Sequence, residues 1–355
     1  MNSESIVHIS EVDISPISGM GRVEYNWKIA FERRGFNFIH IGPREVGFCF
    51  HKSLFPYKAY NYFKNLKIKP RAFIVHEPAS GQFVRRGIPC FLESHGVERR
   101  SWENGDTIKS FITQKLYPIW RLRNCDIGLS KADKLLLINT DDKIFTQNKY
   151  TRRSEDIFIF KNGVNSPSGI INNLSSDRFV VLFNGTWIQR KGIHVLIEAA
   201  KSLYEKGYTD ISYLLIGTGK NTIEVLNDWP TCLRESITVI EKFDQSEEIK
   251  YLSSANLFVL PSFSEGQPLS MLQAMAAGKC CITTNCDGQK DIIINDETGL
   301  LFPIGDHFAL SDLMIRCYLD RELIQKIGGL AKIEMKKRLW ETVSDEVVDF
   351  VLKNT

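Results

Sequence analysis

The chain has 355 residues, of which 43% are hydrophobic and 25% charged, a composition typical of a globular protein too long for one small core. Its formal net charge of +3 is too small to indicate nucleic-acid binding. The eight cysteines lack zinc-site spacing, no secretory signal is visible, and no stretch approaches the roughly twenty apolar residues of a membrane span, so we expect a cytoplasmic protein with free thiols.

Strand-like and helix-like segments alternate along the first half of the chain. The first strand is followed by a glycine-containing loop at 13–22 and a helix at 23–35. Apolar runs that end in polar clusters predict strands at 5–10, 36–42, 71–77, 88–96, 125–130 and 156–163. This alternation predicts an α/β fold, a doubly wound parallel sheet with ligand-binding groups at the carboxyl ends of its strands.

The second half repeats the design. Strands are predicted at 178–185, 211–219, 236–243, 257–262 and 279–285, and helices at 191–207, 246–255 and from Pro268 to before Gly278. The polar, Asn/Ser/Gly-rich stretch 162–177 marks the join. We therefore expect domains at 1–165 and 176–330, followed by a terminal helix at 331–355.

One strand–turn–helix unit has the features of a ligand site. A buried strand at 257–260 is followed by a turn that carries Glu265, and Pro268 stands where a helix begins. The first N–H groups of that helix, on Leu269 and Ser270, would attract an anion. Gln273 follows as a second polar side chain. The pattern predicts a site for a phosphorylated, hydroxyl-rich ligand, although an ordinary strand–turn–helix unit has the same pattern.

The segment SFSEGQPLSMLQAMAAGK at 262–279 resembles the donor-site signature of glycosyltransferase family 4, a retaining family with the GT-B fold. FNGTWIQRKGIHVLIEA, LLIGTG, FIFKNGVN and FLESHGVERRSW resemble other segments of that family. The resemblance implies two Rossmann-like domains that face each other across a cleft, the first binding the acceptor and the second the nucleotide sugar. It also implies that the terminal helix crosses back to the first domain.

The activity implied by the resemblance is retaining, metal-independent transfer of a hexose-type sugar. The donor would be a nucleoside-diphosphate sugar, with a UDP-sugar favoured, and no further cofactor would be needed. The acceptor would be a hydroxyl of a cell-surface glycan or a lipid-linked molecule, as in polysaccharide biosynthesis for the cell envelope. An alternative is a non-catalytic, sugar-nucleotide-binding member of the same fold.

Family resemblance also implies roles for individual residues. Glu265 and His95 would act on the transferred sugar, and Lys191 would contact the donor diphosphate. The family usually has arginine where this chain has Thr186, and glutamate where it has Gln273. The neutral Gln273 amide can still accept hydrogen bonds from ribose hydroxyls, with a weaker bond than a carboxylate would make.

Further donor-binding candidates surround these residues. Arg190 could replace the missing cation or could be a surface residue. Gly266 belongs to the Glu265 turn with Leu269 and Ser270. In the SGMGR loop, Gly19 and Gly21 would allow close backbone approach to the diphosphate, and Arg22 would be a cation from the first domain. No metal-ligand cluster stands out, so we expect no metal.

A nicotinamide-dependent Rossmann enzyme is disfavoured because Glu24 stands where the third glycine of the fingerprint belongs, and because Gly42-Pro43 replaces the acidic residue expected after the second strand. Aromatic residues and lysines mix at 57–71, which suits either a peripheral contact with the inner face of a membrane or a surface helix with its aromatics packed inward.

Overall fold

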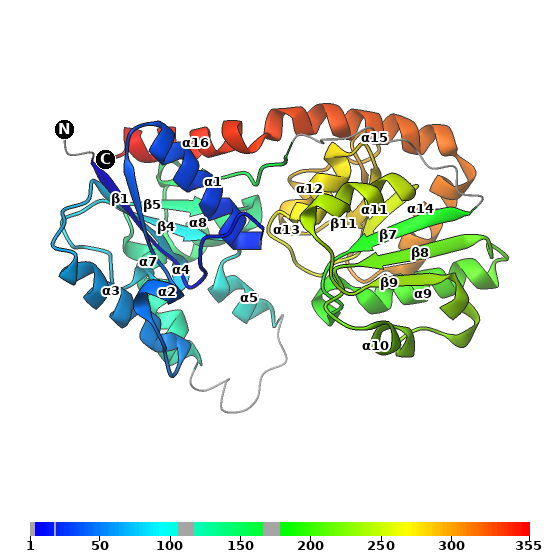
Figure 1. Ribbon diagram of the computed structural model, residues 1–355, viewed down its shortest axis with the longest axis horizontal. Helices are drawn as coiled ribbons and strands as arrows, with labels where there is room; N and C mark the ends of the chain where they lie inside the picture. The colour runs from blue at the N-terminus through cyan, green and yellow to red at the C-terminus, as the bar shows by residue number, and fades with distance from the viewer. Residues whose placement is uncertain (1–3, 18, 106–116, 166–177) are drawn as a thin grey trace. The chain divides into compact units, whose positions relative to one another are not determined.

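The structure, a computed structural model, describes residues 4–17, 19–105, 117–165 and 178–355 (Figure 1). The chain divides into two compact units. The first unit comprises Met1–Gly163 and Trp340–Thr355, and the second comprises Val164–Leu339. Each unit is built on a six-stranded sheet in which all neighbouring strands are parallel.

The sheet of the first unit has the order β2-β1-β3-β4-β5-β6. Its strands are β1 (Ser5–Ile9), β2 (Asn37–Ile41), β3 (Ala72–His76), β4 (Cys90–Ser94), β5 (Lys134–Leu137) and β6 (Ile157–Ile159). The helices of this unit are α1 (Gly19–Arg33), α2 (Pro43–Val46), α3 (Phe55–Asn65), α4 (Glu77–Ser80), α5 (Glu98–Asn104), α7 (Arg123–Lys131), α8 (Thr140–Tyr150) and α16 (Trp340–Lys353).

The last helix, α16, packs beside the first helix, α1, in this unit (Figure 1). One face of α16 is apolar at helical spacing and buries Val343, Val347, Val348 and Val351. At the edge of the contact, Arg33 of α1 lies 2.6 Å from both Glu341 and Asp345. These ion pairs are largely exposed, so the buried valine face contributes more to the association than the charges do.

The sheet of the second unit has the order β12-β11-β10-β7-β8-β9. Its strands are β7 (Phe179–Asn184), β8 (Ile211–Ile216), β9 (Ile237–Ile240), β10 (Leu257–Leu260), β11 (Cys280–Thr284) and β12 (Leu300–Phe302). The helices are α9 (Ile193–Glu205), α10 (Thr222–Asn227), α11 (Glu248–Ser254), α12 (Leu269–Ala276), α13 (Asp287–Lys290), α14 (His307–Leu319) and α15 (Arg321–Met335).

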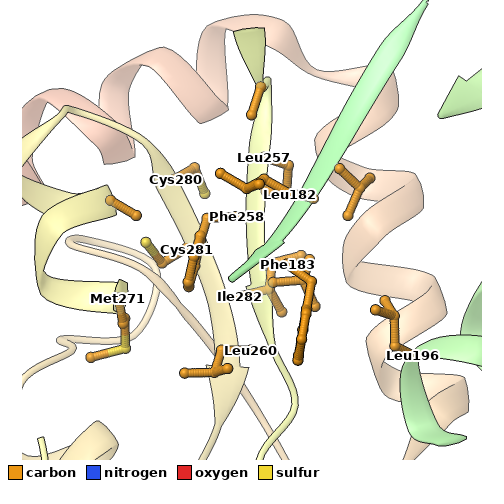
Figure 2. Packing of buried hydrophobic residues seen from close by; sticks show 14 of the residues in the cluster. Leu182, Phe183, Leu196, Leu257, Phe258, Leu260, Met271, Cys280, Cys281 and Ile282 are labelled. Atoms are coloured by element: carbon orange, nitrogen blue, oxygen red, sulfur yellow. The ribbon is translucent and has the colours of Figure 1, made fainter. Parts of the chain in front are cut away.

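The central strands of the second unit are buried on both faces, as expected for a parallel sheet between helices. All four residues of β10 and all five of β11 are buried. Figure 2 shows their side chains packed with Leu182 and Phe183 of β7, Leu196 of α9 and Met271 of α12. This rigid core supports the loops at the carboxyl ends of the strands.

Two local predictions were wrong. Residues 125–130 belong to helix α7, and the strand there is β5, because Cys125, Gly128 and Leu129 share a buried helical face. A β-carbon on Gly128 would lie 1.7 Å from Ser80 Oγ, so this helix packs very closely. Residues 19–22 of the predicted loop are also helical, since α1 begins at Gly19.

The sequence predicts one helix over 331–355, but the structure has parts of two helices there. Helix α15 ends at Met335 in the second unit, and α16 starts at Trp340 in the first. Between them Leu339 is extended and pairs with Val164, whose N–H donates to the Arg338 carbonyl at 2.8 Å. This bridge interrupts the helix.

Candidate nucleotide-sugar site

The order of strands in the second unit reverses between β7 and β10. From β7 the chain runs outward through β8 and β9, then returns to β10 and continues outward through β11 and β12. At such a reversal the loops after the two neighbouring strands diverge to opposite faces, which leaves room for a ligand at the carboxyl edge. The loop after β7 carries Arg190 and Lys191, and the loop after β10 carries Glu265.

These two loops meet at an ion pair. The Lys191 ammonium Nζ lies 2.6 Å from Glu265 Oε1, with only 13% and 9% of the two side chains exposed. Ser262 donates a hydrogen bond to the same oxygen at 3.0 Å. The structure therefore brings together a lysine and a carboxylate that the sequence placed 74 residues apart, and it holds both partly out of water.

Gly192 explains why Lys191 reaches this position. Its φ of +70° lies in the left-handed region, and a β-carbon there would lie 1.8 Å from the Pro261 carbonyl oxygen. Only glycine fits this contact between the β7 loop and the end of β10. Arg190 also points to the same loop, where it donates to the Ser264 carbonyl at 2.6 Å and lies 3.4 Å from Glu265 Oε1. Its side chain is 44% exposed.

The loop after β11 contributes residues that the sequence reasoning missed. Asp287 Oδ2 accepts a hydrogen bond from the Glu265 backbone N–H at 3.2 Å. A β-carbon on Gly288 would lie 1.5 Å from the Gly266 carbonyl oxygen, so this glycine permits the close contact of the two loops. The signal in the sequence was the Asp-Gly pair two residues after the strand predicted at 279–285, and β11 neighbours β10 in the sheet.

Helix α12 follows the Glu265 turn and begins at Leu269, with Pro268 as its N-cap residue. The N–H groups of Leu269 and Ser270 therefore open the helix and have no intrahelical partner. Gly278, with φ of +77°, follows its end as predicted. Gln273 is half-buried on this helix, and within the described residues its amide nitrogen is buried without a hydrogen-bond partner.

The structure places the donor-binding candidates Gly19, Gly21 and Arg22 in helix α1 and not in the loop that the sequence predicts. Gly19 and Gly21 lie in the first turn of α1, and Gly21 is buried. Arg22 is also buried and donates to the Ile17 carbonyl at 3.1 Å. This bond holds Arg22 against its own N-terminal loop. The structure therefore adds no evidence that Arg22 contacts the diphosphate.

His95 follows β4 in the first unit and is held on two sides. Its Nε2 lies 2.7 Å from Glu93 Oε1, and its ring meets Phe160 edge-on at 5.2 Å between ring centroids. The other carboxylate oxygen of Glu93 lies 3.0 Å from His8 Nε2. The sequence did not indicate this buried carboxylate, because its second partner, His8, lies 85 residues away in the chain.

The histidine–carboxylate contacts continue to β2. His8 Nδ1 lies 2.9 Å from His40 Nδ1, and Glu24 of α1 lies 3.9 Å from His8. Burial raises the pKa of Glu24 well above its usual range, and the charge of Glu93 adds to the effect. Burial lowers the pKa of His40 to about 3. Burial opposes ionisation of Glu93, but hydrogen bonds from His8 and His95 outweigh it and lower the pKa of Glu93.

Two sets of described side chains have metal-ligand geometry. The ligand atoms of His8, Glu24 and His40 lie within 4.8 Å of one another, and so do those of Asp13, His40 and Glu45. The sequence did not indicate either set. His8 and His40 already contact each other, and burial raises the pKa of Glu24, so this set would have to rearrange to bind a cation.

The 57–71 segment forms most of helix α3, and its aromatic residues point inward. Tyr60, Tyr62, Phe63 and Leu66 pack against the core of the first unit, while Tyr57 is 53% exposed. The surface helix with inward aromatics is therefore the interpretation that the structure favours. None of the helices in the described ranges is long and apolar enough to cross a membrane.

The second unit resembles a known family in sequence. Residues 170–332 match the family model described as glycosyl transferases group 1. The capsular polysaccharide biosynthesis glycosyltransferase CapM of Staphylococcus aureus is 26% identical over 270 residues, covering 66% of this chain and 71% of CapM. An Escherichia coli UDP-Gal:alpha-D-GlcNAc-diphosphoundecaprenol alpha-1,3-galactosyltransferase is 25% identical and covers 74% of this chain and 70% of that protein. With some other relatives the alignment spans as little as 32% of the relative's length.

The fold comparison extends over the whole chain. The structure of sucrose-phosphate synthase from Thermosynechococcus elongatus superposes with a TM-score of 0.81 at 19% identity, covering 99% of this chain and 98% of that one. The two parallel sheets, the returning C-terminal helix and the matched family model agree with one another. The chain therefore has the GT-B fold, and most of its second unit matches the family model of glycosyl transferases group 1.

Proposed function

We propose that the protein is a retaining, metal-independent glycosyltransferase that uses a nucleoside-diphosphate sugar, with UDP-sugars as the favoured donors. The acceptor is a hydroxyl of a cell-surface glycan or of a lipid-linked molecule. The observation that carries this proposal is the Lys191–Glu265 pair at the β7/β10 reversal, beside the start of α12. The names of the CapM and galactosyltransferase relatives support the substrate class.

The chemistry follows from the charges at this site. Departure of a nucleoside diphosphate leaves negative charge on the phosphates. Lys191, Arg190 and the first N–H groups of α12 supply positive charge and donors without a cation. Glu265 would then exchange its bond with Lys191 for hydroxyls of the transferred sugar and stabilise positive charge at the reacting carbon. His95 is assigned to the transferred sugar as well.

The test has two stages. A thermal-shift screen with UDP-, GDP-, ADP- and dTDP-sugars identifies the donor, because a ligand that binds the folded state raises its melting temperature. Transfer is then measured by NMR with the donor found, and the anomeric configuration of the product shows whether it is retained. An inverted product would contradict the proposed stereochemistry, and stabilisation by no nucleotide sugar would contradict the site.

A non-catalytic member of the fold is the second candidate, and Thr186 and Gln273 favour it. Thr186 is exposed after β7, where it provides no positive charge for a phosphate. Sugar-nucleotide turnover measured with and without acceptor separates the two candidates. Binding without hydrolysis or transfer, over a panel of lipid-linked and glycan acceptors, would establish the non-catalytic role.

We also propose a partner surface on the first unit, which shares only Tyr57 with the 57–71 segment. Six exposed apolar residues form what we call the aromatic patch: Phe48, Phe50, Leu54, Tyr57, Ile119 and Trp120. Five of them line one cavity of about 660 Å³ together with Arg123, and His51 meets Trp120 edge-on. Residues 46–76 contain five lysines, one arginine and no carboxylate. Exposed aromatics beside positive charge suit a bilayer surface with anionic lipids.

Vesicle co-sedimentation tests this surface. The wild type should bind vesicles containing phosphatidylserine and should be released by salt, because part of the attraction is electrostatic. Replacing Phe48 and Phe50, which are 83% and 89% exposed, by serine should weaken binding roughly tenfold or more. Replacing the exposed Phe308 of the second unit by serine is the control. Equal binding by all variants would overturn this assignment.

A further inference from the structure

We propose that Glu93 is a positioning residue for His95, and that it fixes which ring nitrogen of His95 carries a proton and which is left for a ligand. The inference rests on the proposed function for its catalytic consequence, although the arrangement itself can be tested without activity. Glu93 is fully buried near the end of β4, and its two carboxylate oxygens contact two different imidazoles.

The carboxylate determines the tautomers. An ionised carboxylate only accepts hydrogen bonds, so both imidazoles must present an N–H to it. His95 then carries a proton on Nε2, at 2.7 Å from Glu93. In this tautomer Nδ1 has no proton and is left for a ligand. His8 likewise donates from Nε2 at 3.0 Å, and the short Nδ1–Nδ1 contact with His40 shares one further proton.

The surroundings distinguish Glu93 from its neighbours. Two other buried carboxyls lie nearby, Glu24 on α1 and Glu77 at the start of α4. Burial raises the pKa of Glu24 well above its usual range and that of Glu77 to about 8, so burial opposes the charged form of both. Of these three carboxyls, only Glu93 has its pKa lowered, and it is the one that contacts His95.

The groups around Glu93 and His95 come from several elements. His8 comes from β1, His40 from β2 and His76 from β3, and Phe160 closes the other side of the His95 ring. Burial lowers the pKa of His76 to about 4, so it is neutral at physiological pH and adds no charge beside Glu93. A buried ion that serves only stability is readily replaced by apolar packing. Its pairing with a partly exposed histidine indicates a role in orienting that histidine, in the way that a buried carboxylate fixes an imidazole tautomer in other enzymes.

The direct experiment is the tautomeric state of His95 in protein labelled with ¹⁵N-histidine, measured by long-range ¹H–¹⁵N correlation without any ligand. We expect the Nε2–H form in the wild type. In Glu93→Gln, the amide offers one acceptor and one donor group, so one of the two imidazoles must present an unprotonated nitrogen. A changed state of His8 or His95 is therefore expected. A wild-type His95 protonated only on Nδ1 would overturn the proposal, even if the variant failed to fold.

The matched control is Glu77→Gln, which replaces a second buried carboxyl whose charged form burial opposes. Its side chain accepts from Ser94 Oγ at 2.7 Å and from the Glu98 N–H, and neither bond involves an imidazole. We expect it to leave the His95 tautomer unchanged. The same shift in both variants would show a general disturbance of the strand ends and would contradict a specific role of Glu93.

Kinetics connect the arrangement to the reaction. Glu93→Gln should lower kcat by about tenfold or more with little change in KM for the donor, the scale seen when the hydrogen-bond partner of a metal-ligating histidine is lost. The double variant with His95→Ala should be no slower than His95→Ala alone, because Glu93 acts through that ring. Additive losses would refute the coupling. Correct tautomers in a protein that transfers no sugar would refute the proposed function and leave the positioning role standing.

Discussion

Removing the Lys191 ammonium tests the nucleotide site most directly. The lysine is largely buried, and in the free protein its partner is Glu265 at 2.6 Å. A charge-assisted contact to a diphosphate from such a position is worth about 2–3 kcal/mol, so Lys191→Ala should weaken nucleoside-diphosphate binding roughly 30- to 150-fold. Arg190, with 44% of its side chain exposed, is too loosely held to compensate fully.

The measurement is isothermal titration calorimetry with the free nucleoside diphosphate, since affinity then does not depend on acceptor or turnover. Lys206→Ala is the control, because Lys206 belongs to an exposed ion pair with Asp312 in the same unit. The stability of Lys191→Ala should also fall, since Glu265 is left without its main partner, and Glu265→Gln in that background should restore part of it. Unchanged affinity for UDP, GDP, ADP and dTDP would refute the assigned site.

Three further outcomes are expected. Glu265→Gln and His95→Ala should each reduce turnover while nucleoside-diphosphate affinity stays nearly constant, and equal losses in both quantities would reassign them to nucleotide binding or folding. Activity should survive dialysis against EDTA, whereas loss that Mg²⁺ or Mn²⁺ reverses would show a metal requirement. Gln273→Glu should tighten binding of a ribose donor by up to about tenfold and of a 2′-deoxyribose donor much less, and equal factors for both would remove Gln273 from the ribose site.

Sequence alone located most strands because a parallel sheet buries both faces of each strand and so leaves continuous apolar runs. The same rule failed at 125–130, where a short apolar run belongs to the buried face of helix α7. Period and length cannot separate the two states in so short a segment. The start of α1 was missed for a related reason, since Gly19 and Gly21 are helix breakers in isolation and are accepted here within a packed helix.

Some residues of the candidate site could be predicted from the sequence and others could not. Lys191 and Glu265 could be found from sequence because each stands in a loop directly after a strand, and the structure joins them. Glu93 could not be found, because its role depends on His8, 85 residues away on a strand that is not its neighbour in the sheet. Only the tertiary fold shows that one carboxylate serves two imidazoles. The close glycine contacts of Gly192 and Gly288 are likewise visible only once the loops are placed.

The return of α16 to the first unit has a consequence for biosynthesis. Domains are usually completed in the order in which the ribosome delivers them, with the N-terminal domain first. Here residues 1–163 emerge without the helix that packs on α1, and that helix is translated only after the whole second unit. The second unit, in contrast, is contiguous from Val164 to Leu339 and can complete its core while the ribosome is still working. Of the two units, the one that is synthesised first is therefore the last to complete its fold. Until α16 is available, the surface of α1 that it will cover stays accessible to chaperones.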